Sequence, residues 1–374
     1  MKNKLSLFLA LIFLALILFF VLPELLSRQI LNGEKYNQVS SVDQLAKPEI
    51  EPLMEAIIPP LDIVAYDAKL NELANNPLVK IVEPKIDLAT GEPMPLPAVK
   101  PNLWPVNTVY PNAGAILPFN RILAYYGNLY SKKMGVLGEY EEVEMLRRLD
   151  EEVLKWNTVD PTIPVVPALH YIAVVAQLGA GQDGKYRARM PDLEIEKVLK
   201  IAKKINALVF LDIQVGLSDL QTEVPLLLKY LKLPNVHLGV DPEFSMKTGA
   251  RPGKVVGTLD ALDINFTAEY LAKIVRENNL TPKILVVHRY TQKMVTNYQE
   301  IKPLPEVQIV MHMDGWGGAA KKLGTYKYFI HKEPVQFTGF KLFYKNDILT
   351  PGTTLMTPEE LLKLNPRPIY IQFQ

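Results

Sequence analysis

The sequence predicts a (β/α)8 barrel over residues 115–374, and two observations lead to this fold class. Short apolar runs of strand length alternate with helical patterns, which is the order of βα units on a parallel sheet. Eight such runs fall within about 260 residues, close to the size of a closed barrel. An open doubly wound sheet is the alternative, but a strand as the final element favours closure because it can pair with the first strand.

The predicted strands are runs of aliphatic, β-branched and aromatic residues, as strands buried on both faces require. In chain order they cover residues 121–127, 164–172, 207–215, 236–243, 283–289, 307–313, 338–345 and 369–374. Side chains alternate between the two faces of a strand. In the run 236–243, Val236, Leu238 and Val240 would face the helices, so the polar positions between them would point into the barrel.

Helical patterns fill most of the intervals between these strands. In chain order they cover residues 138–156, 191–205, 217–232, 258–279, 291–300 and 317–324, with a last helix after Thr357. Pro191 and Asp192 form a favourable first turn, and Thr357 with Glu360 resembles a capping box. An eighth outer helix is missing, and we expect the N-terminal segment to cover that gap.

The N-terminus predicts a membrane anchor over residues 1–27. Lys2 and Lys4 precede an uncharged stretch, 5–22, whose only polar residue is Ser6. As a helix this stretch would span about 27 Å, close to the thickness of a bilayer core. A cleavable signal peptide is the alternative, but no small-residue cleavage site follows. The basic start favours a cytoplasmic N-terminus, which would place the rest of a single-pass cell-membrane protein outside the cytoplasm.

The composition of residues 28–114 predicts a proline-rich extracytoplasmic stalk. Twelve of the chain's 30 prolines lie here, and proline removes a backbone donor and restricts the residue before it. We expect an extended, semi-rigid spacer, interrupted by one short helix over 62–75. Trp104 and Tyr110 are apolar enough for part of the segment to pack on the barrel instead.

Composition excludes several classes of function. The 374 residues contain no cysteine, which excludes disulfides, thiolate metal sites and a cysteine nucleophile. Lysine and arginine total 41 against 40 aspartates and glutamates. Because there is no basic excess, we expect no nucleic-acid partner.

Polar residues of chemically useful kinds stand where the predicted strands end. The carboxyl ends of parallel strands meet at one end of a barrel, where barrel enzymes keep their active sites. The predicted binding residues there are Tyr126, His170, Asp212, Gln214, His288, Asp314 and Lys341. Burying so many ionisable groups side by side is costly unless they pair or serve a site, so we expect a pocket.

The sharpest short motif is Asp241-Pro242-Glu243, whose two carboxylates would share one strand face. In glycosidases that use the substrate's own N-acetyl group, such an Asp orients the acetamide and the Glu protonates the leaving oxygen. Glu243 and Asp241 are therefore the predicted catalytic residues. The alternative is structural: Asp241 would cap the loop, and Glu243 would bind an inward lysine or arginine.

Two glycine-rich segments follow predicted strands. Residues 179–184 match G-x-G-x-x-G, but no helix opens directly after them, which argues against a dinucleotide site. We expect a mobile loop that carries Tyr186, Arg187 and Arg189 toward a ligand. In the segment 315–318, Trp316 would stack on a sugar ring as a binding residue or simply pack.

Several of these segments together resemble a family of secreted or surface-attached bacterial proteins with a TIM-barrel, glycosidase-type domain: PVVPALHYIAVVA, LDIQVG, GVDPEFSM, VVHRYT, MDGWG and GFKLFYKND. The likeness covers about residues 115–374 and implies that fold. More distantly, GVDPEF and VMHMDGW are similar to D-x-E glycosidases of the chitinase type. The longer acidic signature that those chitinases carry before the Glu is absent here. Glycosidases with one Glu after strand four and another after strand seven fit less well, because 338–347 contains no Glu.

The sequence therefore predicts a membrane-anchored, externally facing hydrolase of a glycan, such as a cell-wall polymer, with no cofactor or metal. A second hypothesis is a metal-dependent hydrolase. Its donors would be His170, Asp212, Asp241, His288, His312 and Asp314, although the sequence has no H-x-H or H-x-x-x-H pair. A third hypothesis is a non-catalytic barrel that binds wall polymer or a partner protein.

Overall fold

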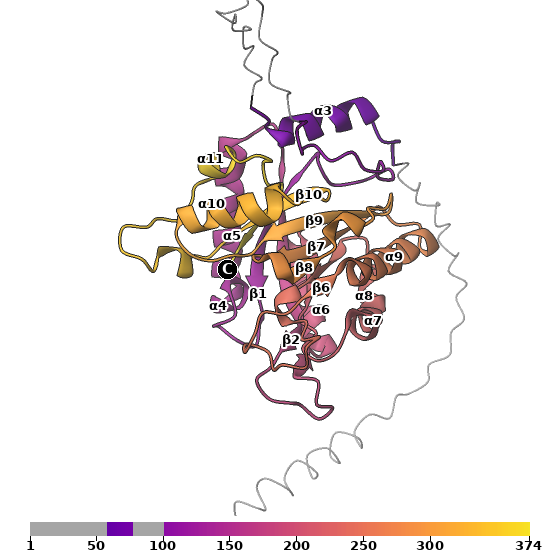
Figure 1. Ribbon diagram of the computed structural model, residues 1–374, viewed down its shortest axis with the longest axis vertical. Helices are drawn as coiled ribbons and strands as arrows, with labels where there is room; N and C mark the ends of the chain where they lie inside the picture. Colours follow the sequence, from indigo (N-terminus) through magenta and orange to yellow (C-terminus); the bar gives the residue numbers. More distant parts are fainter. Residues whose placement is uncertain (1–57, 78–100) are drawn as a thin grey trace, which may run out of the picture. The chain divides into compact units, whose positions relative to one another are not determined.

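The computed structural model describes residues 58–77 and 101–374. Within them, parallel strands form a closed barrel around which each strand pairs with the next (Figure 1). Its members are β1 (Arg121–Gly127), β2 (Val165–Ala176), β4 (Leu208–Ile213), β5 (Val236–Val240), β7 (Lys283–Arg289), β9 (Val307–Met313), β10 (Phe337–Leu342) and β11 (Tyr370–Phe373). The last strand returns to the first, with Ile122 opposite Tyr370. The predicted eight-stranded barrel, sealed by its final strand, is confirmed.

Helices surround the strands and follow most of the predicted intervals. The longer ones are α5 (Glu142–Val159), α6 (Asp192–Lys204), α9 (Ala261–Glu277) and α10 (Ala319–Tyr326), and the short ones are α4 (Val136–Glu139), α7 (Leu220–Glu223), α8 (Leu228–Leu231) and α11 (Pro358–Leu361). The capping box of Thr357 and Glu360 starts α11 as predicted. The predicted helix 217–232 is divided by a 3-10 turn, Val224–Leu227, that contains Pro225.

The predicted helix over 291–300 is wrong. This segment forms two 3-10 turns, Gln292–Met294 and Tyr298–Glu300, around the two-residue strand β8 (Val295–Thr296). β8 pairs with β6 (Leu259–Asp260). The side chains of Thr296 and Asn297 donate hydrogen bonds to the Asp260 carboxylate, at 2.7 and 2.8 Å. These tertiary contacts outweigh the weak helical propensity of the segment.

The strands separate two apolar layers. Outward-facing residues pack under the helices, as predicted for Val236, Leu238 and Val240. Inward-facing residues near the start of the strands fill the interior; they include Ile122, Ala168, Phe210, Ile284, Val286 and Val310. We call this N-terminal end of the barrel the floor, and the C-terminal end of the strands the mouth.

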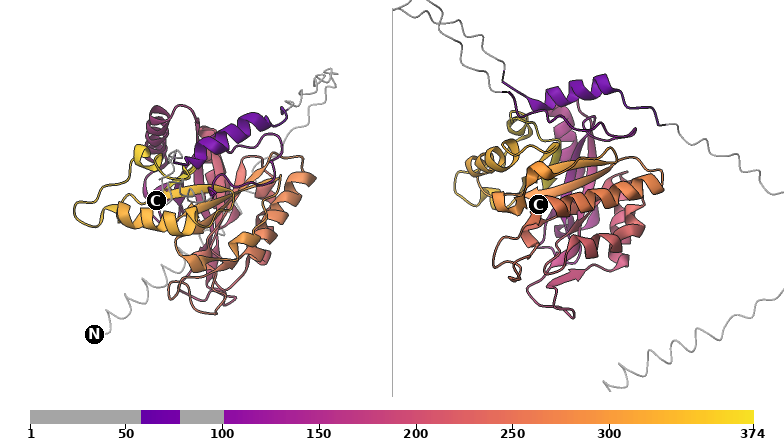
Figure 2. Two further views of the ribbon diagram at one scale, coloured as in Figure 1. Left: turned by 45° about the horizontal axis from the view of Figure 1, so that its top comes forward. Right: turned by 45° about the vertical axis from the view of Figure 1, so that its right-hand side comes forward.

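A helix near the start of the described chain closes the floor. It is α3 (Ile63–Ala74), capped by Asp62 and Asn75, which confirms the helix predicted over 62–75. Its Tyr66 and Leu73 belong to the inner apolar cluster, and Figure 2 shows α3 lying across one end of the barrel. The helix therefore covers the starts of the strands, and the prediction that this segment fills the place of the missing eighth outer helix is wrong.

Part of the predicted stalk thus packs on the barrel. The Trp104 side chain is buried, and its indole N–H donates to the backbone carbonyl of His331 at 2.9 Å. Tyr110 stays 44% exposed and donates its hydroxyl to Asp67 at 3.0 Å. The docking of Trp104 shows that residues 101–114 are not a free spacer.

The predicted membrane anchor over residues 1–27 and the stalk residues 28–57 and 78–100 lie outside the described residues. Across 58–77 and 101–374, every helix is too short or too polar to cross a bilayer.

Candidate active site

A pocket of about 640 Å³ opens at the mouth of the barrel. Seven of the predicted site residues line it: Tyr126, Gln214, Asp241, Glu243, Asp314, Trp316 and Lys341. Further lining residues that the sequence analysis did not single out include Lys133, Met134, Tyr290, Thr291, Lys321 and Asn346. The carboxyl ends of the strands thus hold the site, as expected of a barrel of this kind.

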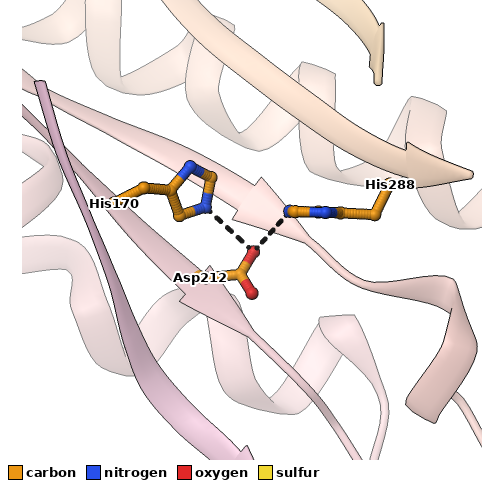
Figure 3. Close-up of side chains that lie close together, drawn as sticks. All are labelled: His170, Asp212 and His288. Carbon is orange, nitrogen blue, oxygen red and sulfur yellow. Dashed lines mark ion pairs between the residues drawn. The ribbon is translucent and has the colours of Figure 1, made fainter. Parts of the chain in front are cut away.

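The remaining predicted binding residues lie below the surface of the pocket. His170 on β2, Asp212 on β4 and His288 on β7 are fully buried (Figure 3). The Nε2 atoms of His170 and His288 lie 3.2 and 3.3 Å from the same oxygen, Asp212 Oδ1. Near the end of β5, a Cβ atom on Gly239 would come within 2.4 Å of both His170 Nε2 and Asp212 Oδ1. Only glycine lets these side chains approach β5 so closely.

A chain of polar contacts joins this buried group to the pocket. The Tyr126 hydroxyl donates to Asp212 Oδ2 at 2.9 Å. Asp314 accepts from His288 Nδ1 through Oδ2 and pairs with Lys341 Nζ through Oδ1, both at 2.9 Å. The Lys341 ammonium also lies 3.8 Å from the centre of the Tyr126 ring. Every one of these side chains comes from the inward face of a strand or from the residue just after it.

Opposite charges set the protonation of this network. Burial alone would lower the pKa of His288, but the carboxylates of Asp212 and Asp314 raise it to about 10. Burial would likewise raise the pKa values of Asp212 and Asp314. The imidazoles of His170 and His288 hold the pKa of Asp212 well below its usual range, and Lys341 with His288 does the same for Asp314. At neutral pH the network therefore contains ionised carboxylates beside a protonated His288.

Asp241 and Glu243 occupy a turn rather than the strand. β5 ends at Val240, and a 3-10 turn, Pro242–Phe244, follows. The prediction that the two carboxylates share one strand face is therefore wrong, although both line the pocket. Asp241 Oδ1 accepts the Glu243 backbone N–H at 3.0 Å, and Oδ2 accepts from Gln214 at 3.3 Å. The capping role considered for Asp241 is thus present, whereas the lysine at the mouth pairs with Asp314.

Both carboxyl groups of the motif are held toward their neutral forms. Burial raises the pKa of Glu243, and the negative charge of Asp314 raises it further. Burial also raises the pKa of Asp241 well above its usual range, against the opposing effect of His288. The Tyr290 hydroxyl interacts with Glu243 and lowers the pKa of that carboxyl in part. A glutamic acid kept protonated in an open pocket can act as a proton donor.

Trp316 is presented by a loop that a buried ion pair holds in place. Lys322 Nζ pairs with Asp347 at 2.9 Å and also donates to the Gly315 carbonyl at 2.8 Å. The Asp347 carboxylate accepts the Gly317 backbone N–H at 2.9 Å. The Trp316 ring remains 50% exposed, with the Lys321 ammonium 4.4 Å from its centre. Trp316 lines the pocket, where a flat apolar ring can stack on a sugar ring.

The predicted ligand-carrying loop after β2 has a structural role instead. Arg187–Arg189 forms β3, which pairs antiparallel with the end of β2. The guanidinium groups of Arg187 and Arg189 both bind the buried Glu223. Tyr186 stacks against Arg251, at 5.5 Å. The two arginines are committed to Glu223 and do not line the pocket, so the prediction that they approach a ligand is wrong.

His312, a donor in the metal hypothesis, is buried in the interior. Its ring packs against Tyr370 and His288, with ring centres 5.0 and 5.1 Å apart. Within the described residues, the group of side chains close enough to share a metal ion contains only His170, Asp212 and His288. Asp241, His312 and Asp314 are not part of it.

Comparisons with known proteins find structural similarity at low sequence identity. No protein-family model matches the chain, and no curated protein does. Among solved structures, the chain is similar to the cellulase Cel5C_n, at 15% identity and a TM-score of 0.34. That alignment covers 59% of this chain and 65% of the cellulase, so the chain spans less than two thirds of its length.

Two further solved structures are similar at the same distance. A ruminal GH26 endo-beta-1,4-mannanase aligns at 12% identity and a TM-score of 0.33, over 68% of this chain and 58% of the mannanase. A GH18 chitinase from Pseudoalteromonas aurantia aligns at 10% identity and a TM-score of 0.35, over 68% of this chain and 93% of the chitinase.

Proposed function

We propose that the barrel is a hydrolase of a glycan and that Glu243 is its general acid. The observation that carries this proposal is a pair of carboxyl groups, Asp241 and Glu243, in one open pocket with raised pKa values. A general acid must hold its proton until the leaving group needs it. Burial at the mouth of the barrel supplies that condition for Glu243.

The proposed reaction uses an N-acetyl group next to the anomeric carbon of the substrate. Glu243 gives its proton to the glycosidic oxygen while the bond from that oxygen to the anomeric carbon breaks, and the acetamide oxygen bonds to the anomeric carbon. A water oxygen then displaces the acetamide oxygen, and the water proton returns to Glu243. Asp241, already fixed by Gln214 and the turn backbone, steers the acetamide, and Trp316 stacks on a neighbouring sugar.

The metal-dependent hydrolase fits the pocket less well. A catalytic ion must contact both substrate and a water molecule. His170, Asp212 and His288, which do converge, have no exposed surface and do not line the pocket. Acid–base chemistry by the lining carboxyls therefore explains the mouth better than a metal ion does.

The test is turnover by the full-length chain on chito-oligosaccharides and on purified peptidoglycan. Glu243→Gln preserves shape and removes the proton donor, so we expect the rate to fall by about 10²–10⁴-fold with little change in ground-state binding. Asp241→Asn should also slow the reaction. Glu306→Gln is the matched control, because Glu306 is a buried glutamate before β9 that pairs with Arg276 far from the pocket. A Glu243→Gln protein at the wild-type rate would remove the proposal, and binding without turnover would favour the non-catalytic barrel.

We further propose that residues 5–22 anchor the protein in the cell membrane, with the barrel outside the cytoplasm. The uncharged apolar stretch behind Lys2 and Lys4 supports this arrangement. A protease added to intact spheroplasts should release a soluble fragment that contains the barrel. A mature N-terminus near Leu25 would show cleavage instead of anchoring, and a barrel protected until lysis would contradict the outside location.

A further inference from the structure

We propose that His170, Asp212 and His288 bind one divalent transition-metal ion, of the zinc type, inside the barrel beneath the pocket. The three residues come from β2, β4 and β7, and each offers one ligand atom within 4.8 Å of the others. Figure 3 shows both imidazole rings directed at the same Asp212 oxygen.

The atoms that face one another are unsatisfied by hydrogen bonds. His170 Nε2, His288 Nε2 and Asp212 Oδ1 are buried, and within the described part of the chain none has a hydrogen-bond partner. The nitrogen–oxygen distances of 3.2 and 3.3 Å are short enough for hydrogen bonds. The hydrogen bonds are absent because the ring N–H groups do not point at the carboxylate oxygen. Buried polar atoms in this state are rare and require an explanation. One shared cation would satisfy all three atoms together, and it would displace the proton that His288 Nε2 carries in the metal-free network.

The separations also match those of ligands on one ion. Zinc binds histidine nitrogen and carboxylate oxygen at about 2.0–2.2 Å in tetrahedral geometry. A nitrogen and an oxygen at such distances stand about 3.3–3.5 Å apart by the geometry of a tetrahedron. The two distances to Asp212 Oδ1, 3.2 and 3.3 Å, lie at the short end of this separation.

The remaining polar atoms of the three residues have outer partners, among them the Gln372 side-chain amide, 3.1 Å from His170 Nδ1. His288 Nδ1 bonds to Asp314 at 2.9 Å, and His170 Nδ1 bonds to the Tyr370 hydroxyl at 2.6 Å. Asp212 Oδ2 accepts from Tyr126 at 2.9 Å. Outer partners of this kind fix the tautomer and orientation of metal-bound imidazoles. A carboxylate behind a metal-bound histidine, as Asp314 lies behind His288, is one such arrangement.

The ligand types and their burial define the ion and its role. Two imidazoles and one carboxylate suit Zn²⁺ and Fe²⁺ rather than Ca²⁺ or Mg²⁺, which prefer all-oxygen sites. All three side chains are 0% exposed, so the ion would not handle substrate. It would join β2, β4 and β7 across the interior and stabilise the closed barrel, since binding to the folded state raises stability.

The test uses full-length protein purified in detergent, stripped with chelator and dialysed against Zn²⁺. We expect one zinc per chain by elemental analysis, a higher Tm with zinc, and an X-ray absorption spectrum with two imidazole ligands. His170→Gln, Asp212→Asn and His288→Gln should each lose the zinc and the Tm increase. His237→Gln is the matched control, because His237 is another buried histidine of the interior but accepts the Ile284 N–H at 3.1 Å outside this group. The His237→Gln protein should keep both the bound zinc and the Tm increase.

The wild-type chain decides the proposal even where a variant does not fold. A stripped wild-type chain that takes up no zinc and shows no Tm increase overturns it, and the group is then a metal-free network in which Asp212 is shared by two imidazoles. Zinc that all three ligand variants retain also overturns it, because the ion would lie elsewhere. Dialysis against Fe²⁺ in the absence of oxygen, with the same readouts, identifies the ion that the site prefers.

Discussion

The floor and the mouth of the barrel are built from the same strands but filled in opposite ways. On β4 the inward position changes from Phe210 to Asp212, and on β7 it changes from Val286 to His288. The floor is apolar and closed by α3, while the mouth is ionisable and open. The step of two residues preserves the inward face. Packing of apolar side chains therefore stabilises the floor, whereas specific pairing of charges stabilises the mouth.

The largest effect should come from removing the strand that serves both ends. β11 contributes Tyr370 to the inner apolar cluster and Gln372 to the hydrogen bonds around His170. Deleting residues 369–374 should expose the edges of β1 and β10, so we expect aggregation and loss of cooperative unfolding. Urea unfolding and light scattering measure this. Replacing the exposed residues 349–352 with glycine and serine is the control, and a truncated chain of unchanged stability would contradict the closed barrel.

The next largest effect should come from removing a charge at the mouth. Lys341 is buried and pairs with Asp314, so Lys341→Met leaves a buried carboxylate without one partner. We expect a loss of about 3–5 kcal/mol in the free energy of unfolding. Lys345→Met is the matched control at the same end of β10, because Lys345 pairs with Glu139 at the surface. This substitution should change the free energy of unfolding by about 0.5 kcal/mol or less. Equal losses would remove the distinction between buried and exposed pairs.

A smaller effect is expected from a change of shape at the floor. Ile284→Val removes one methylene from the inner apolar cluster and should cost about 0.5–1.5 kcal/mol. The pH dependence of turnover should stay as in the wild type, because the floor carries no group of the pocket. Chemical denaturation gives the first quantity and a pH–rate profile the second. A shifted profile would show that the two ends are coupled.

The smallest effect should be a shift in pH dependence at the mouth. As general acid, Glu243 acts only while protonated, so turnover should fall as pH rises through its raised pKa. Tyr290 lowers that pKa. Tyr290→Phe should therefore raise the pKa of Glu243 and move the alkaline limb of kcat/KM to higher pH. Tyr298→Phe is the control, because Tyr298 packs against the outer apolar layer under the helices. A limb that moves to lower pH would contradict the assigned role of Glu243.

Sequence pattern was sufficient for most of the barrel. The limits predicted for β1, β7 and β9 agree with the structure, because each strand is a continuous apolar run bounded by turn residues. Alternation also placed Asp212, Gln214 and Lys341 on the inward face. These features depend on local periodicity, which a single sequence contains in full.

The depth of each side chain was not predictable in the same way. Alternation tells which face a residue occupies, but the stagger of the strands decides how far below the mouth it lies. His170, Asp212 and His288 are consequently buried beneath the pocket, while Tyr126 lines it. Tyr290 stands one residue beyond the end of β7, with the parity of Val286 and His288, so alternation indicates it in the same way as it indicates Asp314 after β9. The membrane anchor and the roles of Asp241 and Glu243 stay predictions.

The pairing of β1 with β11 also determines when the domain can fold during synthesis. Ile122 meets Tyr370 only after almost the whole domain has left the ribosome. Contacts so distant along the chain form slowly, and until then β1 keeps an unpaired edge. The nascent chain therefore passes through a long period as an incomplete barrel that can bind chaperones or other nascent copies. Closure by β11 makes the emergence of this strand from the ribosome the step that commits the barrel to its native state.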